Sequence, residues 1–142
     1  YIVAHFHYVL VAGSLFALFA GTYYWMPKWT GHMYDVKLAN IHFWMSAIFV
    51  NVLFFPQHFL GLAGMPRRIP DYATQFADWN MWSSIGAFGF GFSQLLFVWV
   101  VIKCVRGGAR ATSQVWDEAK GLEWTVPSPA PYHTFQQAPD IK

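Results

Sequence analysis

The sequence predicts an all-α membrane protein with three transmembrane helices and an extended polar C-terminal tail. Of its 142 residues, 56% are hydrophobic and 20% are aromatic, whereas only 11% are charged, compared with about 25% charged in typical soluble domains. Residues 1–27, 38–66 and 79–102 contain no Asp, Glu, Lys or Arg. Each of these stretches exceeds the roughly 18 to 20 residues that a helix needs to cross a bilayer.

The first helix is expected over residues 1–27. Four aromatic residues cluster near its end, as is typical of membrane interfaces: Tyr23, Tyr24, Trp25 and Trp29. A loop is expected to begin at Lys28. The run starts at Tyr1 with neither Met nor a basic segment before it, which argues against a signal peptide and suggests a piece of a longer chain.

The second helix is expected over residues 38–60. Pro56 should kink or end it, because proline lacks an amide donor and crowds the carbonyl group four residues earlier. The following loop is rich in glycine and proline and carries Arg67 and Arg68.

The third helix is expected over residues 79–105, so that residues 1–106 form a three-helix membrane unit. Gly86, Gly89 and Gly91 would let a neighbouring helix approach closely, although glycine is also simply common in membrane helices. The tail, residues 107–142, contains four of the eight prolines and mixed charge, which favours an extended strap over a separate core.

The distribution of basic residues predicts the orientation of the helices. If the three helices alternate, five basic residues lie on one side, at Lys28, Lys37, Lys103, Arg106 and Arg110, against Arg67 and Arg68 on the other. The positive-inside rule then places the tail on the cytoplasmic or matrix side. The net charge of +2 is too small and too dispersed for a nucleic-acid partner, and the single cysteine, Cys104, suits an apolar filler.

Two histidines inside the first apolar run are the strongest candidates for chemistry. His5 and His7 are two residues apart, which is about 200° on a helix, so their imidazole rings leave on opposite faces. They cannot share one metal ion in this conformation, but each can serve a separate cofactor, with Phe6 between them. The alternative is that both rings are satisfied by hydrogen bonds across helices.

Depth places these histidines near the same membrane face as the arginine pair. From His7 to Pro27 is about 30 Å of helix, a full hydrocarbon thickness. Arginine pairs carboxylates in a fork geometry, so Arg67 and Arg68 suit the propionates of haem. The alternative is that both arginines lie among lipid headgroups beside Asp71.

Four motifs carry a resemblance to a known family. They are AHFHYVL at residues 4–10, FFPQHFLGL at residues 54–62, GMPRR at residues 64–68 and PYHTF at residues 131–135. In this order they resemble the C-terminal part of the catalytic subunit I of haem-copper cytochrome c oxidases, and the match covers essentially the whole chain. The resemblance implies the last three helices of a twelve-helix bundle.

The resemblance also implies roles for the residues of the first helix. His5 matches the axial ligand of the high-spin haem where oxygen is reduced, and so is the catalytic residue of this chain. His7 matches an axial ligand of the low-spin haem, and Phe6 lies between the two haems. The implied cofactors are two haems, of the A type.

Further implied roles lie around the second helix and its loop. Arg67 and Arg68 match the pair that binds haem propionates, and Gln57 falls near the low-spin haem. Copper belongs to the full subunit and magnesium lies nearby, but this chain should ligate neither. His42, His58 and His133 match no copper ligand of the family, and the chain alone should not reduce oxygen.

The enzyme implied by the resemblance takes electrons from cytochrome c through a copper-bearing subunit II, reduces dioxygen to water and pumps protons. Its partners would be the rest of subunit I, other oxidase subunits and the lipid bilayer, in a bacterial plasma membrane or the mitochondrial inner membrane. Three alternatives stay open: a quinol oxidase of the same superfamily, a bis-histidine electron-transfer cytochrome using His42 or His58, and a haem-free structural or transport subunit.

Overall fold

Three long helical rods make up most of the protein. The computed structural model describes residues 1–139, so residues 140–142 of the expected tail lie outside the described part. The first rod consists of α1 (Ile2–Leu10), a π-helical segment (Val11–Leu15) and α2 (Phe16–Thr30). The second rod is α3 (Val36–Leu62), and the third is α4 (Ala77–Arg106). Each is long and apolar enough to cross a membrane. The expectation of an all-helical membrane fold with three spans is therefore confirmed.

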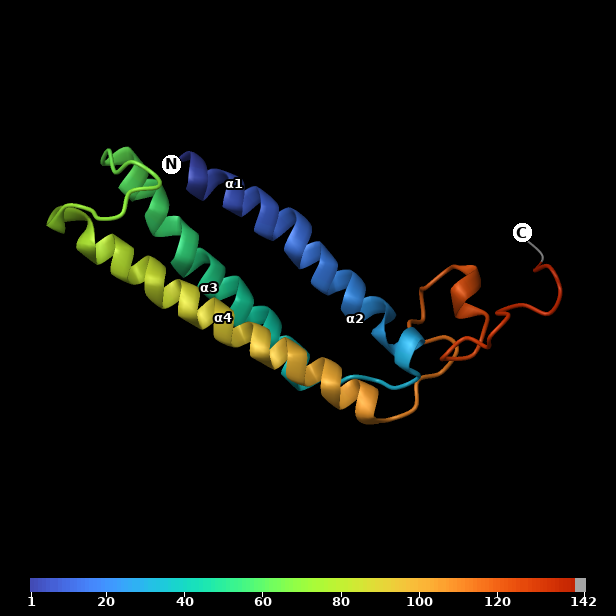
Figure 1. The fold of residues 1–142 in the computed structure, drawn as a ribbon. Coiled ribbons are helices and arrows are strands. Elements are labelled where there is room, and N and C mark those ends of the chain that lie inside the picture. Colours follow the sequence, from blue (N-terminus) through green and yellow to red (C-terminus); the bar gives the residue numbers. More distant parts are fainter. Residues whose placement is uncertain (140–142) are drawn as a thin grey trace.

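The rods run side by side, with the N-terminus and the α3–α4 connection at one end and the tail at the other (Figure 1). Short 3₁₀ helices lie before α4 and in the tail, at Thr74–Phe76 and Leu122–Trp124. Within residues 1–139, the β-structure consists of one isolated bridge, between His32 and Arg110. This bridge joins the α2–α3 loop to the start of the tail, as expected if both lie on one side of the membrane.

The first rod extends beyond the expected residue 27 and ends at Thr30, so Lys28 lies in a helix and the expected loop start was wrong. Pro27 removes one amide donor, but its fixed φ angle is compatible with a helix. The chain turns only at Gly31, whose φ of 74° places it in the left-handed region. The Gly31 amide donates to the carbonyl of Pro27 at 2.9 Å, which closes the end of α2.

The second rod begins before the expected residue 38 because Asp35 caps it. The Asp35 carboxylate accepts hydrogen bonds from the amides of Lys37 and Leu38 at 3.1 and 3.2 Å. Lys103 at the end of α4 also donates to Asp35, at 2.6 Å. The hydrogen bond from Lys103 has the largest effect on the Asp35 carboxyl and that from the Leu38 amide the next largest. Together they hold the pKa of Asp35 below its usual value. At the other end α3 continues through Pro56 to Leu62, so Pro56 does not end it.

Close packing joins α3 to α4 through two glycines of α4. A Cβ atom at Gly86 would overlap the backbone of Leu53, and one at Gly89 would overlap the ring of Phe49. The expected close approach is therefore confirmed at these two positions. At Gly91 it was wrong, because a Cβ there would have no neighbour within 4 Å.

Hydroxyl groups add polar contacts inside the same helix pair. The buried Ser46 and Ser93 share a hydrogen bond of 2.9 Å between their Oγ atoms. Ser83 donates to the carbonyl of Leu53 at 2.6 Å. Such hydrogen bonds contribute about 0.6 kcal/mol on average between membrane helices, so they add modestly to the close packing of α3 against α4.

Residues 107–139 of the tail are largely irregular and pack back against the end of α2. Trp116 donates its Nε1 hydrogen to the carbonyl of Tyr24 at 3.0 Å, and Trp124 packs edge-on to the Tyr24 ring. Lys28 donates hydrogen bonds to the carbonyls of Ser113 and Val126, on either side of Trp116 and Trp124 in the sequence. Trp124 and Val126 become buried as a result. The aromatic residues supply the apolar surface that the proline content alone did not indicate.

Candidate functional site

The first turns of α1 place two imidazole rings in different surroundings. His7 is half-buried, and its ring stacks on that of Phe54 from α3 with centroids 4.6 Å apart and an interplanar angle of 16°. His5 is exposed. Both residues lie within the regular α-helix Ile2–Leu10, so the two-residue spacing does separate their side chains by about 200° around the axis.

The tautomer of the neutral His7 ring follows from its hydrogen bond. Nδ1 lies 2.8 Å from the carbonyl oxygen of Val3, and a carbonyl oxygen only accepts. Nδ1 therefore donates, which leaves the lone pair of a neutral ring on Nε2. A histidine whose Nδ1–H group donates a hydrogen bond in this way is oriented to offer Nε2 to a metal.

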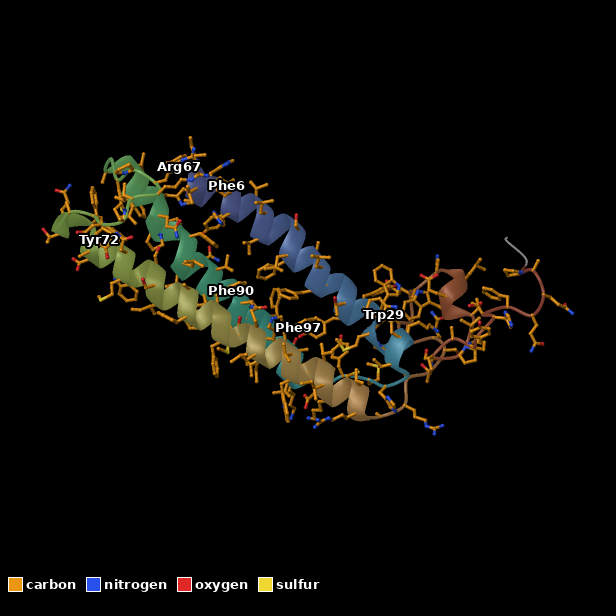
Figure 2. The ribbon with its side chains drawn as sticks, viewed as in Figure 1. Phe6, Trp29, Arg67, Tyr72, Phe90 and Phe97 are labelled. Carbon is orange, nitrogen blue, oxygen red and sulfur yellow. The ribbon has the colours of Figure 1, made fainter. Side chains whose placement is uncertain are left out.

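Phe6 lies between the two histidines in sequence and packs on one of them. Its ring stacks on that of His7 with centroids 4.5 Å apart and an interplanar angle of 30°. The side chain is 36% exposed. Figure 2 shows Phe6 and Arg67 at the same end of the helical bundle, so the start of α1 and the loop after α3 lie at one end of the protein.

The arginine pair and Gln57 line one cavity. This cavity of about 600 Å³ lies between the first turn of α1, the end of α3 and the loop that follows it, and Gln57, Arg67 and Arg68 are among its lining residues. Contact between α1 and α3 depends on Gly61, because a Cβ there would overlap the backbone of Tyr1. The sequence thus brings together three of the expected site residues, whereas His5, Phe6 and His7 do not line this cavity.

The two guanidinium groups have no carboxylate partner within residues 1–139. The salt bridge of this part of the chain joins Lys103 and Asp35 at the opposite end. Asp71, which the sequence placed close to the arginines, accepts a hydrogen bond from the amide of Tyr72. Arg67 and Arg68 are both exposed, so their donors are available to an anion.

Two further histidines lie in α3: His42 is far from His5 and His7, whereas His58 lies near the start of α1. His42 is buried at 1% exposure, and its Nδ1 lies 3.0 Å from the hydroxyl of Tyr23. It precedes Phe54 by twelve residues, which corresponds to about 18 Å along α3. His58 packs against Tyr1, which directly precedes α1, with ring centroids 5.3 Å apart. In residues 1–139 no three His, Cys, Asp or Glu side chains gather in a group that could hold a metal ion.

Sequence reasoning missed two residues near the histidines. Phe54 is the aromatic partner of His7, and Tyr8 donates its hydroxyl hydrogen to Asn51 of α3 at 2.7 Å. The available signals were the polar Asn51 inside an apolar run and the position of Tyr8 one helical turn after His5. Neither signal identifies a partner more than forty residues away.

Comparison with known proteins leads to the same family that the four sequence motifs resemble. The model of the family described as "Cytochrome C and Quinol oxidase polypeptide I" matches residues 1–89. Cytochrome c oxidase subunit 1 of Cereibacter sphaeroides is 50% identical over 141 residues, which cover 98% of this chain and 25% of that protein. The chain therefore spans about a quarter of the length of this relative.

Proposed function

Because the chain belongs to the family of subunit I of cytochrome c and quinol oxidases, we propose that it supplies one axial histidine to each of two haems. His5 binds the high-spin haem iron and His7 binds the low-spin haem iron. The observation that carries this proposal is the placement of two imidazoles on separate faces of one regular helix. The site is catalytic only as part of the complete oxidase.

The chemistry of the two imidazoles fits haem iron. The hydrogen bond from His7 Nδ1 to Val3 leaves Nε2 as a ligand. The ring of His7 also stacks on that of Phe54, which covers one of its faces. His5 is exposed in the isolated chain, as required of a ligand whose cofactor is held on the other face of α1.

When bound, the two haems, of the A type, and the copper of the full subunit supply the redox chemistry that reduces dioxygen to water. The residues of this chain set the geometry. One rigid helix carries both ligands, so the separation between the two sites is fixed by the backbone and not by loops. Phe6 lies between them in sequence, and its ring stacks on that of His7.

The cavity at the outer end suits the carboxylates of haem propionates. Arg67 and Arg68 line it without a carboxylate partner of their own in residues 1–139, and an arginine fork matches a carboxylate. Gln57 lines the same cavity and offers an amide donor near the low-spin haem. The two positive charges stabilise ionised propionates, which links the redox state of the haems to proton affinity.

The Arg68→Gln variant tests this link in an otherwise intact enzyme. Removal of one guanidinium charge should lower the affinity of the site for ionised propionate and shift the haem potential. Redox-linked proton release and the haem potentials are the measurements. If neither changes, Arg68 does not have the role assigned to it.

We infer the wider setting from the same family. The complete enzyme takes electrons from cytochrome c through a copper-bearing subunit and couples their transfer to proton pumping, with magnesium bound nearby by residues outside this chain. The tail faces the cytoplasm or matrix, because five basic residues lie at that end. The relative named as a cytochrome c oxidase supports this donor. If the complete oxidase oxidises a quinol and not cytochrome c, the quinol branch of the family is the correct assignment.

Geometry disfavours a bis-histidine haem bound by His7 and His42. His42 lies about 18 Å along α3 from the level of His7, which is too far for one iron to be bound by both. An absorption spectrum of the complete complex addresses the haem-free alternative, since a complex without a Soret band contains no haem.

Single histidine substitutions test the proposal directly. In the complete oxidase, His5→Ala should abolish the high-spin haem signal and oxygen turnover, because the catalytic iron loses its axial ligand. His7→Ala should remove the low-spin signal and retain the high-spin one. If both variants lose the same haem, the assignment of the two ligands to separate haems is incorrect.

A further inference from the structure

A directed hydrogen bond ties the histidine-bearing segment to α3. The hydroxyl of Tyr8 donates to Oδ1 of Asn51 at 2.7 Å. Asn51 in turn donates through Nδ2 to the carbonyl of Ala47 at 2.8 Å, which determines that its oxygen faces Tyr8. Within residues 1–139, this is the one hydrogen bond between side chains that joins α1 to α3.

A π-helical segment separates the turn that carries the histidines from the contacts that α2 makes with α3. The π-helical segment Val11–Leu15 follows directly, and its bonds reach one residue further than those of an α-helix. Beyond it, the hydroxyl of Tyr23 lies 3.0 Å from Nδ1 of His42 on α3, and next to this contact a cavity of about 470 Å³ opens between α2 and α3, lined by Phe19 and Phe43 among others. The angular setting of α1 therefore depends on contacts of its own residues.

Among those contacts, only the one made by Tyr8 has a strong directional preference. Ala4 is fully buried, but it presents a single methyl group. The stack of His7 on Phe54 is an apolar contact in which the rings can slide or turn at small cost. A hydrogen bond weakens steeply as its angle departs from linearity, so Tyr8 opposes rotation of the helix in both directions.

Rotation of α1 would move both ligands at once. Tyr8 follows His7 directly and lies three residues after His5, so all three residues belong to about one turn of the helix. Turning the helix would carry His5 and His7 in opposite directions relative to α3. Their alignment with two cofactors on separate faces is therefore governed by one angle.

We propose that the Tyr8–Asn51 hydrogen bond is a positioning contact that fixes the rotation of α1 and thereby orients His5 and His7 toward their haems. This inference rests on the proposed function, because it concerns the alignment of the same two ligands. Tyr8 and Asn51 act through the histidines and bind no iron themselves.

The experiment uses the complete oxidase carrying Tyr8→Phe, Asn51→Leu or both substitutions. Tyr8→Phe removes a single oxygen atom and leaves the packing of the ring on His58 in place. We expect each single variant to change the ratio of oxidised to reduced low-spin haem at a fixed potential by two- to tenfold. The electron paramagnetic resonance g-values of the ferric low-spin haem should shift as well, because they respond to the orientation of the imidazole plane.

The double variant separates this hydrogen bond from independent effects. Because both substitutions remove the same contact, the double variant should show a shift no greater than the larger single one. The matched control is Tyr24→Phe, since the Tyr24 hydroxyl makes no hydrogen bond within residues 1–139, and its spectra should equal those of the wild type.

Haem content distinguishes this inference from the proposed function. Tyr8→Phe should bind both haems at the wild-type level, with altered g-values and an altered ratio. Unchanged g-values and ratio, additive shifts in the double variant, or loss of haem from Tyr8→Phe would each overturn the positioning role. If instead His5→Ala and His7→Ala retained both haem signals, the proposed function itself would fail.

Discussion

The contact between Lys28 and the tail permits a prediction with a magnitude. Lys28 is 6% exposed, and its Nζ donates to the carbonyls of Ser113 and Val126 at 2.9 and 2.8 Å. The same ammonium group lies 5.2 Å from the centre of the Trp124 ring. Hydrogen bonds to a charged group contribute about 1.5–3 kcal/mol each, and a cation–π contact about 0.5–2 kcal/mol.

The expected effect of Lys28→Met is smaller than the sum of these contributions. Burying the ammonium group costs several kcal/mol, which methionine does not incur, so we expect a net destabilisation of the folded tail of about 2–4 kcal/mol. The population of the opened tail should then rise by roughly 30- to 1,000-fold, since each 1.4 kcal/mol corresponds to a factor of ten.

Hydrogen–deuterium exchange over residues 111–126 of the assembled oxidase measures this opening. The amides of Ala119 and Trp124 donate to tail carbonyls and should exchange faster in the variant by a factor in that range. The matched control is Lys37→Met, because the exposed Lys37 ammonium has no partner within residues 1–139. A change of less than about threefold, or an equal change in the control, would refute the argument that Lys28 anchors the tail.

Two further predictions concern the contacts between helices. Gly86→Ala should destabilise the α3–α4 pair by about 1–3 kcal/mol, because the added methyl group would overlap Leu53. Gly91→Ala should be neutral. Thermal denaturation of both variants is the measurement, and equal midpoints would contradict the packing argument. Asp35→Asn should lower the thermal midpoint at pH 7, because the depressed pKa of Asp35 means that its ionised form stabilises the fold above the unfolded value of about 3.9. This stabilisation is lost as the pH falls through the depressed pKa, so the difference between variant and wild type should vanish there, and a difference independent of pH would exclude the carboxylate as its source.

Much of the fold could be predicted because the membrane imposes a simple constraint on sequence. Charged residues are expensive in the hydrocarbon region, so the three charge-free stretches marked the three rods. The exact ends depended on local chemistry. The cap that Asp35 provides places the start of α3 at Val36, before the expected residue 38, whereas the φ of Gly31 and not Pro27 determines where α2 ends.

Other features could not be predicted because they arise from contacts between distant parts of the chain. The burial of Trp124 requires the tail to return to α2, which proline content and charge do not encode. The π-helical segment between α1 and α2 leaves no periodic signal in an apolar run. Within the candidate site, the arginine pair and the two histidines were visible as polar exceptions, but the partnership of Tyr8 with Asn51 was not.

The central claim is that one helix binds two irons on separate faces. The most direct measurement is a cofactor-containing structure of the assembled oxidase in which the nearest metal to each imidazole Nε2 is identified. We expect His5 and His7 to bind different irons on either side of Phe6. Two imidazoles bound to one iron, or neither within bonding distance of a metal, would contradict this account.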